Sequence, residues 1–402
     1  DKLLPEHKTQ VFFIKQASDF PVIYDNDIVV DALFGIGIAR PIEGWLKTLV
    51  EHINAHKAFV VSIDMPSGLY CDTMNSQTDA IIVSDHCFCF QSPALSFFNE
   101  LGYKYAPSWE AIDIGLDRAF LYEQKTPILI GLAQAKAVYK ARTRFSSKID
   151  YGHLLSVSGS FGKIGASILA AKAALQSGVG MLTVHAPRCG YEILQSTCPE
   201  AVLQCDVDLE VISDVSISER INTLLIGPGI GLENKTKSAV KSLLPKASKV
   251  VLDADALNIL AQEKCYELIP PKAIFTPHDG ELKRLIGTWS DPFERIEKTR
   301  AFSCQYDCIM VLKGAFTQVV YKDELYINTS GNPGMATAGC GDVLSGIIAA
   351  FLAQGYAPQV AAFFSVYIHG LSADIIAETQ GHESITAGKI IEHIGVALKR
   401  LG

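Results

Sequence analysis

One carboxylate stands behind closely spaced glycines in the stretch NPGMATAGCGDVLSG, residues 332–346, and an apolar helix pattern follows it. Because glycine has no Cβ, backbone N–H groups can converge there on an anion, and the helix dipole adds positive potential. Asp342, in the first turn, could take the proton of a substrate hydroxyl as a general base. The residues also fit a simple N-cap after a Gly-rich turn. The chemistry that this arrangement suits is phosphoryl transfer, in which positioning and charge stabilisation dominate.

Two further side chains follow predicted strands. Lys313 ends the strand in VLKGAFTQVVY, residues 311–321, and could reach a phosphate or simply occupy a turn. His278, in TPHDGELKRL, residues 276–285, follows the end of another strand and could be an ordinary loop histidine. Ligands of open α/β sheets bind at the carboxyl ends of parallel strands, so both positions are candidates.

Two Gly-rich turns also follow predicted strands. The stretch 156–180 leads into a helix of small residues, and it lacks the Gly-Lys-Ser/Thr order of a P-loop. Its glycines at 159, 162 and 165 match a dinucleotide fingerprint only loosely, so close packing of the helix on the sheet is an equal alternative. The stretch LLIGPGIG, residues 224–231, predicts another ligand edge or a plain turn.

Two aspartates mark strand ends in the first part of the chain. Asp31 lies in VDALFGIG, residues 30–37, and Asp64 lies in SIDMPSG, residues 62–68. Both precede small residues, so we expect them either to converge at one sheet edge or to cap loops.

The composition narrows the class of protein. The chain has 402 residues, is 49% hydrophobic and carries a net charge of −8, which is typical of a globular protein and argues against nucleic-acid binding. An acidic chain can still bind an anionic small ligand at a helix N-terminus. The ten cysteines form no CxxC pair, so we expect buried, reduced thiols in a cytoplasmic protein. No apolar run reaches about 18 residues and no signal peptide is visible at residue 1, so we expect no membrane span.

The elements that must position these residues alternate along the chain. Residues 10–15, 27–34 and 58–65 read as strands and residues 44–56 as a helix, the pattern of a parallel sheet covered on both faces. A seam near residue 118 predicts two domains, residues 1–118 and 119–402. In the second domain, strands are predicted within 153–160, 181–186, 223–229, 249–255, 273–278, 308–314, 317–322 and 324–328. Long helices are predicted at 166–178, 341–355 and 359–378.

Several of these stretches occur in the order found in a known family. The segments GHLLSVSGS, VLDADALN, TPHDGELKRL, VLKG and NPGMATAGCGDVLSGIIAAFLAQG resemble the ADP- or ATP-dependent NAD(P)H-hydrate dehydratases of the ribokinase-like superfamily. The segment DIVVDALFGIGIARPIEGW with VVSIDMPSGLYCDT resembles the later half of the NAD(P)H-hydrate epimerase domain. The resemblance implies a ribokinase-like three-layer α/β/α domain preceded by part of a Rossmann-like α/β/α epimerase domain.

The resemblance also implies the reaction and its participants. The dehydratase would use ADP or ATP, with Mg²⁺, to convert (6S)-NAD(P)H hydrate to NAD(P)H through a phosphorylated intermediate. The epimerase would interconvert the R and S hydrates with K⁺ bound. We expect the hydrate and an adenine nucleotide as ligands, no nucleic acid, no membrane and a homo-oligomer. The competing functions are a ribokinase-like vitamin or sugar kinase and a non-catalytic nucleotide-binding regulator.

Site residues of the dehydratase part follow from the resemblance alone. Asp342 matches the catalytic base that takes the proton of the hydrate. Residues against the hydrate are Ala166, Gly229, His278 and Asp342. Residues against the nucleotide are Lys313, Gly314, Ala315, Phe316, Thr317, Gly339 and Gly341. Cys340 lies between the two glycines, where a reactive thiol would be a liability.

Site residues of the epimerase part are implied in the same way. Asp64 matches the catalytic and hydrate-binding position, and Asp31 and Ser67 match potassium ligands. The substrate loop comprises Gly35, Ile36, Gly37, Ile38, Ala39, Arg40 and Pro41. The Gly-Asn-Asn-Gly-Gly-Asp loop of the family would precede residue 1, and Ala94 follows Pro93 where the family usually has lysine. We therefore expect the present chain not to epimerise the hydrate.

Overall fold

The computed structural model describes residues 12–124 and 126–402, and the chain divides into two units with the main boundary after Gln124; the short segment Asp291–Phe293 is also grouped with the first unit. The division lies six residues beyond the boundary that the sequence suggested, because helix α3 (Arg118–Glu123) is grouped with the first unit. The strand that follows, β5 (Ile128–Ile130), pairs with a strand of the second unit.

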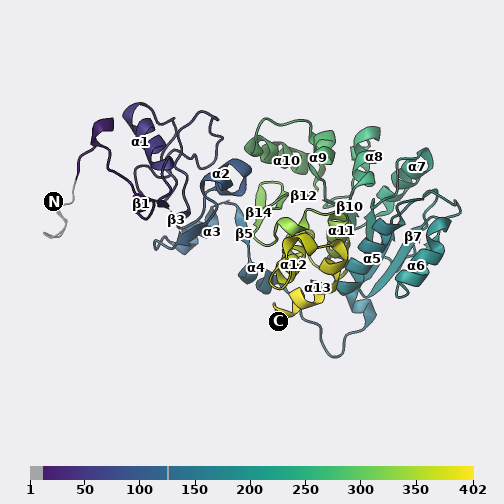
Figure 1. The fold of residues 1–402 in the computed structure, drawn as a ribbon. Coiled ribbons are helices and arrows are strands. Elements are labelled where there is room, and N and C mark those ends of the chain that lie inside the picture. The colour runs from purple at the N-terminus through teal and green to yellow at the C-terminus, as the bar shows by residue number, and fades with distance from the viewer. Residues whose placement is uncertain (1–11, 125) are drawn as a thin grey trace. The chain divides into compact units, whose positions relative to one another are not determined.

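A four-stranded parallel sheet forms the first unit, in the order β1-β2-β3-β4 (Figure 1). Its strands are β1 (Ile28–Asp31), β2 (Phe59–Ile63), β3 (His86–Phe90) and β4 (Trp109–Ile112). Helices α1 (Gly44–Asn54) and α2 (Glu100–Tyr105) accompany it. Leu49, Val50 and Ile53 of α1 recur at helical spacing and pack with Val60 of β2, so one face of the sheet is the core face.

The opposite face of this sheet is apolar and open. Ile28 and Phe59 are neighbours in the β1–β2 register and are 70% and 51% exposed, and Val30 is 62% exposed. Alternate residues of a strand point to opposite faces, so these three side chains share the face turned away from Val60. The sequence pattern predicted helices on both faces of this sheet. Among the described residues, helix α1 packs on the face that carries Val60.

The second unit contains a ten-stranded sheet in the order β5-β14-β13-β12-β11-β10-β9-β6-β7-β8. Strands β6 to β12 run parallel, while β13 lies antiparallel to both β12 and β14. The bounds are β6 (His153–Val157), β7 (Met181–Ala186), β8 (Val202–Cys205), β9 (Thr223–Ile226), β10 (Val250–Leu252), β11 (Ile274–Phe275), β12 (Ile309–Leu312), β13 (Gln318–Tyr321) and β14 (Glu324–Asn328). The central strands are buried along their whole length, as expected for a parallel sheet between two helical layers.

Two layers of helices enclose this sheet. Figure 1 shows α7 to α10 on one side of it and α11 to α13 on the other. The bounds are α4 (Leu132–Val138), α5 (Ile164–Gln176), α6 (Tyr191–Thr197), α7 (Asn234–Leu243), α8 (Asp255–Glu263), α9 (Asp279–Ile286), α10 (Pro292–Tyr306), α11 (Cys340–Ala353), α12 (Pro358–Ala377) and α13 (Ala387–Lys399). Helix α11 is apolar on all sides because α5, α12 and the sheet surround it.

One described helix, α12, is long and apolar enough to cross a membrane by length and composition. However, 78% of its apolar window is buried within the protein, and its residues contribute to the core around Phe364 and Ile368. A helix in the core of a globular domain can have the same length and composition, and α12 lies in such a core.

One predicted strand is wrong in the part that the structure describes. Of residues 10–15, the first two lie outside the described residues, and residues 12–15 form no strand. Phe12 and Phe13 are each 81% exposed. An apolar run alone does not make a strand, because a strand also needs a neighbouring strand to satisfy its backbone hydrogen bonds.

Candidate active site

The turn before α11 has the backbone geometry that the glycines suggested. Gly339 is the N-cap residue and has φ +87°, a left-handed conformation that favours glycine. A Cβ at this position would lie 2.6 Å from Leu169 Cδ1, so a side chain here would also require Leu169 to shift. Asp342 lies in the first turn, as predicted, with the helix N-terminus beside it.

Asp342 lies in an environment that disfavours its charged form. Burial, together with the negative charges of Asp253 and, to a smaller extent, Asp255, raises the pKa of this carboxyl to about 6, although the positive charge of Lys313 lowers it in part. A carboxylate with a pKa near neutral can accept a proton and release it again at the pH of a cell. The environment therefore suits a general base better than a plain helix cap.

Lys313 is held by a buried carboxylate beside this turn. Its Nζ lies 3.4 Å from Oδ1 of Asp253, whose same oxygen accepts a hydrogen bond of 2.7 Å from the Thr276 hydroxyl. A Cβ built on Gly341 would lie 3.4 Å from the Lys313 ammonium. Strands β10, β11 and β12 thus bring a cation to the glycines that precede Asp342.

The turn after Lys313 is fixed by its own hydrogen bonds. Gly314 N donates to Thr317 Oγ1 at 3.4 Å, and the same hydroxyl donates to the Gly314 carbonyl at 3.1 Å. Ala315 and Phe316 lie within this turn, so all five residues from 313 to 317 lie together at the carboxyl end of β12.

Ala166 and Gly229 lie together although 63 positions separate them. A Cβ built on Gly229 would lie 3.2 Å from that of Ala166, and Gly229 has φ +63°. The Ser160 hydroxyl donates to the Gly229 carbonyl at 2.7 Å and so ties the two Gly-rich turns together. Asp255 accepts from Gly231 N at 2.8 Å and lies 3.3 Å from Lys163 Nζ, which links the same turns to β10.

His278 caps α9. Its Nδ1 accepts hydrogen bonds from Gly280 N and Glu281 N, and the Glu281 carboxylate accepts from His278 N at 2.9 Å, which forms a capping box. Its Nε2 lies 3.3 Å from Glu281 Oε1, and the side chain is 59% exposed. The histidine thus has a structural role, and its ring remains accessible at the carboxyl edge of the sheet.

Cys340 is buried in this site. Burial is the main cause that raises the pKa of its thiol, and the Asp342 charge adds to the effect. A raised pKa keeps the thiol protonated and therefore weakly nucleophilic, so the thiol is less of a liability than a reactive cysteine would be at this position.

Asp31 and Ser67 of the first unit meet at the carboxyl ends of β1 and β2. The buried Asp31 carboxylate accepts from Ser67 Oγ at 2.6 Å, from Ser67 N at 2.8 Å and from Ser62 Oγ at 2.9 Å. The Phe34 carbonyl lies 3.3 Å from Ser67 Oγ. The pair thus offers hard oxygen atoms of the kind that bind alkali and alkaline-earth cations.

Asp64 and the loop 35–41 form the second part of that edge. Asp64 has φ +71°, a left-handed conformation that is costly for a residue with a Cβ, and its Oδ2 accepts from Ile36 N at 2.9 Å. A Cβ at Gly35 would lie 2.2 Å from that oxygen, so only glycine allows the carboxylate to approach. Gly37, Ile38, Ala39, Arg40 and Pro41 continue the loop, most of which is exposed. Asp31 and Asp64 therefore lie at the same edge of the sheet, at the carboxyl ends of β1 and β2, and Asp64 contacts the loop.

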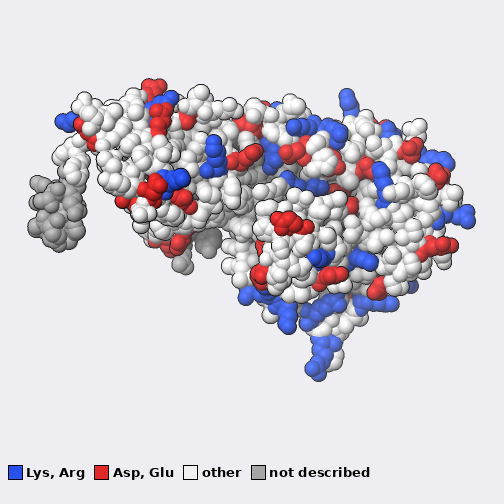
Figure 2. Space-filling view, in the orientation of Figure 1, with Lys and Arg blue, Asp and Glu red and all other residues white. Residues whose placement is uncertain are grey.

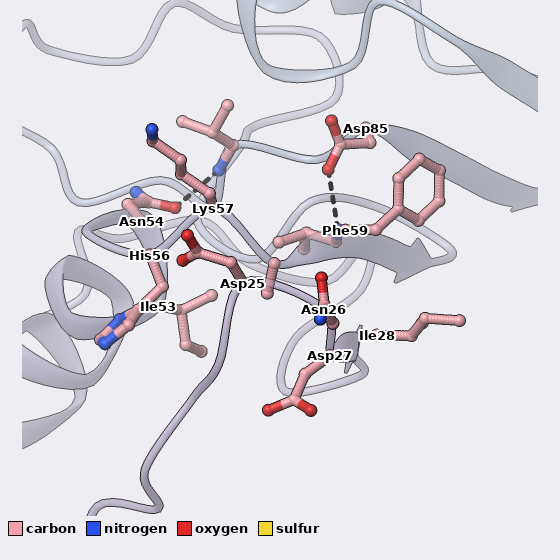
Figure 3. Close-up of a pocket in the computed structure, with 13 residues that line it drawn as sticks. Asp25, Asn26, Asp27, Ile28, Ile53, Asn54, His56, Lys57, Phe59 and Asp85 are labelled. Atoms are coloured by element: carbon pink, nitrogen blue, oxygen red, sulfur yellow. Dashed lines mark hydrogen bonds between the residues drawn. The ribbon is translucent and has the colours of Figure 1, made fainter.

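A separate hollow of about 360 Å³ lies at the opposite edge of the first sheet (Figure 3). Its lining comes from the segments that precede β1, β2 and β3. Asp85 already accepts from Val60 N, and Asn54 accepts from Val83 N, so these polar groups brace the ends of strands. The hollow lies at the amino ends of the strands and is distinct from the edge that carries Asp64.

Sequence reasoning did not select Asp253, Asp255, Lys163 and Thr276 as site residues. Asp253 and Asp255 lie in the stretch that the sequence predicted as the end of a strand. Ala254 between them has φ +47°, an unusual conformation for a residue with a Cβ that the sequence does not reveal. Within the described parts of the chain, no three His, Cys, Asp or Glu side chains form a ready metal site. Figure 2 shows acidic and basic side chains mixed over most of the visible face, with basic side chains gathered along its lower edge.

The second unit is thus a three-layer α/β/α domain in which the side chains and Gly-rich turns described above gather at the carboxyl edge of the sheet. Among solved structures, an ADP/ATP-dependent NAD(P)H-hydrate dehydratase from Bacillus subtilis, co-crystallised with ATP and Mg²⁺, is 26% identical with a TM-score of 0.60, covering 69% of this chain and 99% of that one. A ribokinase-like superfamily protein from Enterococcus faecalis is 28% identical with a TM-score of 0.61, covering 68% of this chain and 96% of that one.

Sequence comparisons give the family. The family described as NAD(P)H-hydrate dehydratase matches residues 154–395, and the YjeF-related protein N-terminus matches residues 2–96. A bifunctional NAD(P)H-hydrate repair enzyme of Moorella thermoacetica is 34% identical over 406 residues, 96% of this chain and 75% of the relative. The relative of the same description in Escherichia coli is 33% identical, over 90% of this chain and 69% of its own length. The chain therefore belongs to the NAD(P)H-hydrate dehydratase family, and the predicted fold class is confirmed.

Proposed function

We propose that this chain repairs hydrated nicotinamide nucleotides by a nucleotide-dependent dehydration of (6S)-NAD(P)H hydrate. The observation that carries the proposal is Asp342, with its pKa raised to about 6, beside Lys313 at the Gly-rich start of α11. The names of the relatives supply the substrate, and the arrangement of charges in this chain supplies a base and an anion site that fit it.

The first step is phosphoryl transfer to the hydroxyl of the hydrate. Asp342 takes the hydroxyl proton as the oxygen attacks the terminal phosphorus of ADP or ATP, and the bond from that phosphorus to the remaining nucleotide breaks. Lys313 and the N–H groups around Gly339 and Gly341 stabilise the charge on the phosphate oxygens. Asp253 keeps Lys313 in place beside those glycines.

The second step is elimination. Hydroxide is a poor leaving group and phosphate a good one, so the carbon–oxygen bond breaks with its electron pair leaving on phosphate. The lone pair of the ring nitrogen forms a double bond to the carbon that loses the phosphate, which offsets the positive charge that develops there. Loss of a proton from the neighbouring carbon then restores the ring double bond and the neutral nitrogen. Ala166, Gly229 and His278 border the region in which the hydrate would lie.

The nucleotide would bring Mg²⁺ with it. Mg²⁺ prefers phosphate and carboxylate oxygens and keeps several waters, so a protein cage is not required. In the first unit, Asp31 and Ser67 would hold K⁺ next to Asp64 and the loop 35–41, the residues that would bind and epimerise the hydrate. A bound K⁺ supplies positive charge near the substrate.

The test is restoration of NADH absorbance from purified NADH hydrate with ADP or ATP and Mg²⁺. We expect turnover by the wild-type chain and a loss of at least about 100-fold in Asp342→Asn, the usual scale for removal of a general base. Asp307→Asn is the matched control, because Asp307 precedes β12 at the opposite edge of the sheet and pairs with Lys322. A stable phosphorylated product with no recovered absorbance would indicate a kinase instead.

A further inference from the structure

Asp206 and His185 form a buried polar pair outside the residues discussed so far. Asp206 follows β8 and His185 lies in β7. Residue Asp206 is 2% exposed and residue His185 is 1% exposed. Their contact, from His185 Nε2 to Asp206 Oδ2, measures 3.0 Å. A buried carboxylate is costly unless it is fully hydrogen-bonded, so the pair needs a structural or functional explanation.

The Asp206 carboxylate collects the backbone of the loop that follows it. It accepts from Asp208 N at 2.8 Å, from Ser213 N at 2.7 Å and from Asp214 N at 3.2 Å, and the Ser213 hydroxyl donates to it as well. Burial raises the pKa of this carboxyl, but the hydrogen bonds outweigh burial and lower the pKa to about 2. One anion therefore closes the loop 206–214 upon itself.

The closed loop is fastened to the first Gly-rich turn. Phe161 N donates to the Glu210 carbonyl at 2.8 Å, and Ser158 N donates to the His185 carbonyl at 3.1 Å. The same turn is joined to the Gly229 turn through the Ser160 hydroxyl and through Gly159 N, which donates to the Pro228 carbonyl at 2.8 Å. A displacement of the loop would thus be transmitted to the pair Ala166 and Gly229.

We propose that Asp206, oriented by His185, is a positioning residue that fixes the loop 206–214 and, through Phe161, the hydrate-binding turns of the dehydratase site. This inference rests on the proposed function for the identity of the ligand. It assigns no contact with the reacting atoms to Asp206. The nucleotide side of the site, around Lys313, is connected to these turns less directly, through Asp255, which binds Gly231 and Lys163 and lies two residues from Asp253.

The test compares Asp206→Asn with the wild type in two measurements. Asparagine has nearly the same volume as aspartate, but its amide NH₂ group would face the N–H and O–H groups that now donate to the Asp206 carboxylate. The loop should therefore loosen, and backbone hydrogen exchange should accelerate in residues 159–163 as well as in 206–214. In steady-state kinetics, KM for NADH hydrate should rise roughly tenfold, the scale expected for lost hydrogen bonds to a charged group, with KM for the nucleotide unchanged. A general loss of stability would not raise KM for the hydrate while leaving KM for the nucleotide unchanged.

Two further variants keep the test decisive. Asp150→Asn is the matched control, because Asp150 also accepts hydrogen bonds, from Ser147, but at the amino end of β6. Ser213→Ala removes a single donor to Asp206 and should give a smaller effect of the same kind if Asp206→Asn does not fold. Unchanged exchange in 159–163 would overturn the positioning role whether or not the chain is active. Faster exchange with an unchanged KM for the hydrate would overturn the link to substrate, and absence of wild-type turnover would overturn the proposed function itself.

Discussion

At the scale of single residues, the balance of charge around Asp342 decides what the site can do. Burial and two neighbouring carboxylates favour the protonated acid, whereas Lys313 favours the carboxylate. Asp253 takes part twice, since it repels the Asp342 charge and holds the ammonium of Lys313. The basicity of Asp342 is therefore a property of the group of charges and not of one side chain.

A prediction about pH follows from this balance. The base acts when it is ionised, so kcat/KM of the wild type should rise with pH through about 6 and then level off. Asp253→Asn removes a like charge and leaves Lys313 unopposed, and both effects lower the pKa of Asp342. The midpoint of the rise should therefore move to lower pH, while the plateau falls because Lys313 loses its anchor. A midpoint that stays in place or moves upward would refute the proposed coupling, and Asp307→Asn should leave the profile unchanged.

At the scale of elements, the site depends on how closely α11 approaches α5. Gly346 of α11 lies against the backbone of α5, and a Cβ there would lie 2.3 Å from the Ala170 carbonyl oxygen. Backbone cannot move aside as a flexible side chain can, so the close contact fixes the position of the whole helix. The N-terminus of α11, with Gly339 and Asp342, is placed by this packing.

Gly346→Ala should therefore destabilise the chain. The expected loss is about 1–3 kcal/mol in the free energy of unfolding, the range for overpacking in a close-packed core. Gly395→Ala is the matched control in α13, because nothing lies within 4 Å of the added Cβ and alanine is the better helix former by roughly 0.8–1 kcal/mol. In denaturant unfolding, the free energy of unfolding should fall for Gly346→Ala and rise for Gly395→Ala. A rise for both substitutions would mean that helix propensity outweighs the close contact at Gly346.

At the scale of the whole molecule, the two units differ in how completely their sheets are covered. The sheet of the second unit is buried along its central strands, while the sheet of the first unit exposes Ile28, Val30 and Phe59 on one face. A contiguous apolar face of this kind favours association with other apolar surfaces.

Charging this face should reduce that association. We expect Ile28→Lys with Phe59→Lys to lower the binding of a hydrophobic dye and the concentration-dependent self-association of the chain measured by sedimentation, without loss of dehydratase activity. Val60→Lys on the covered face should instead unfold the first unit, because it would bury an unpaired charge. Unchanged dye binding in the double variant would mean that the exposed face is not the surface responsible.

Much of the fold was predictable because its strands and helices carry local patterns. The apolar run of β9 and the small-residue helix α5 were predicted from residue types alone. Strand β3, HCFCF, was not predicted, since cysteine, histidine and short length give a weak local signal and its pairing with β2 and β4 is non-local. The strand expected at residues 10–15 failed in its described part for the related reason that periodicity cannot supply a pairing partner.

The sequence by itself determined the alternation of strands and helices, the Gly-rich turns at strand ends and the family, because these depend on residue types in order. It also selected Asp342, Lys313, Asp31 and Asp64 as candidates. Only the tertiary structure decided that Asp253 joins Lys313 to the Asp342 site, that Ala166 meets Gly229 and that Asp206 closes a loop onto the first Gly-rich turn. Each of these contacts unites segments far apart in the chain, and the pKa of Asp342 depends on burial and on charges that approach it only when the sheet and its two helical layers are assembled.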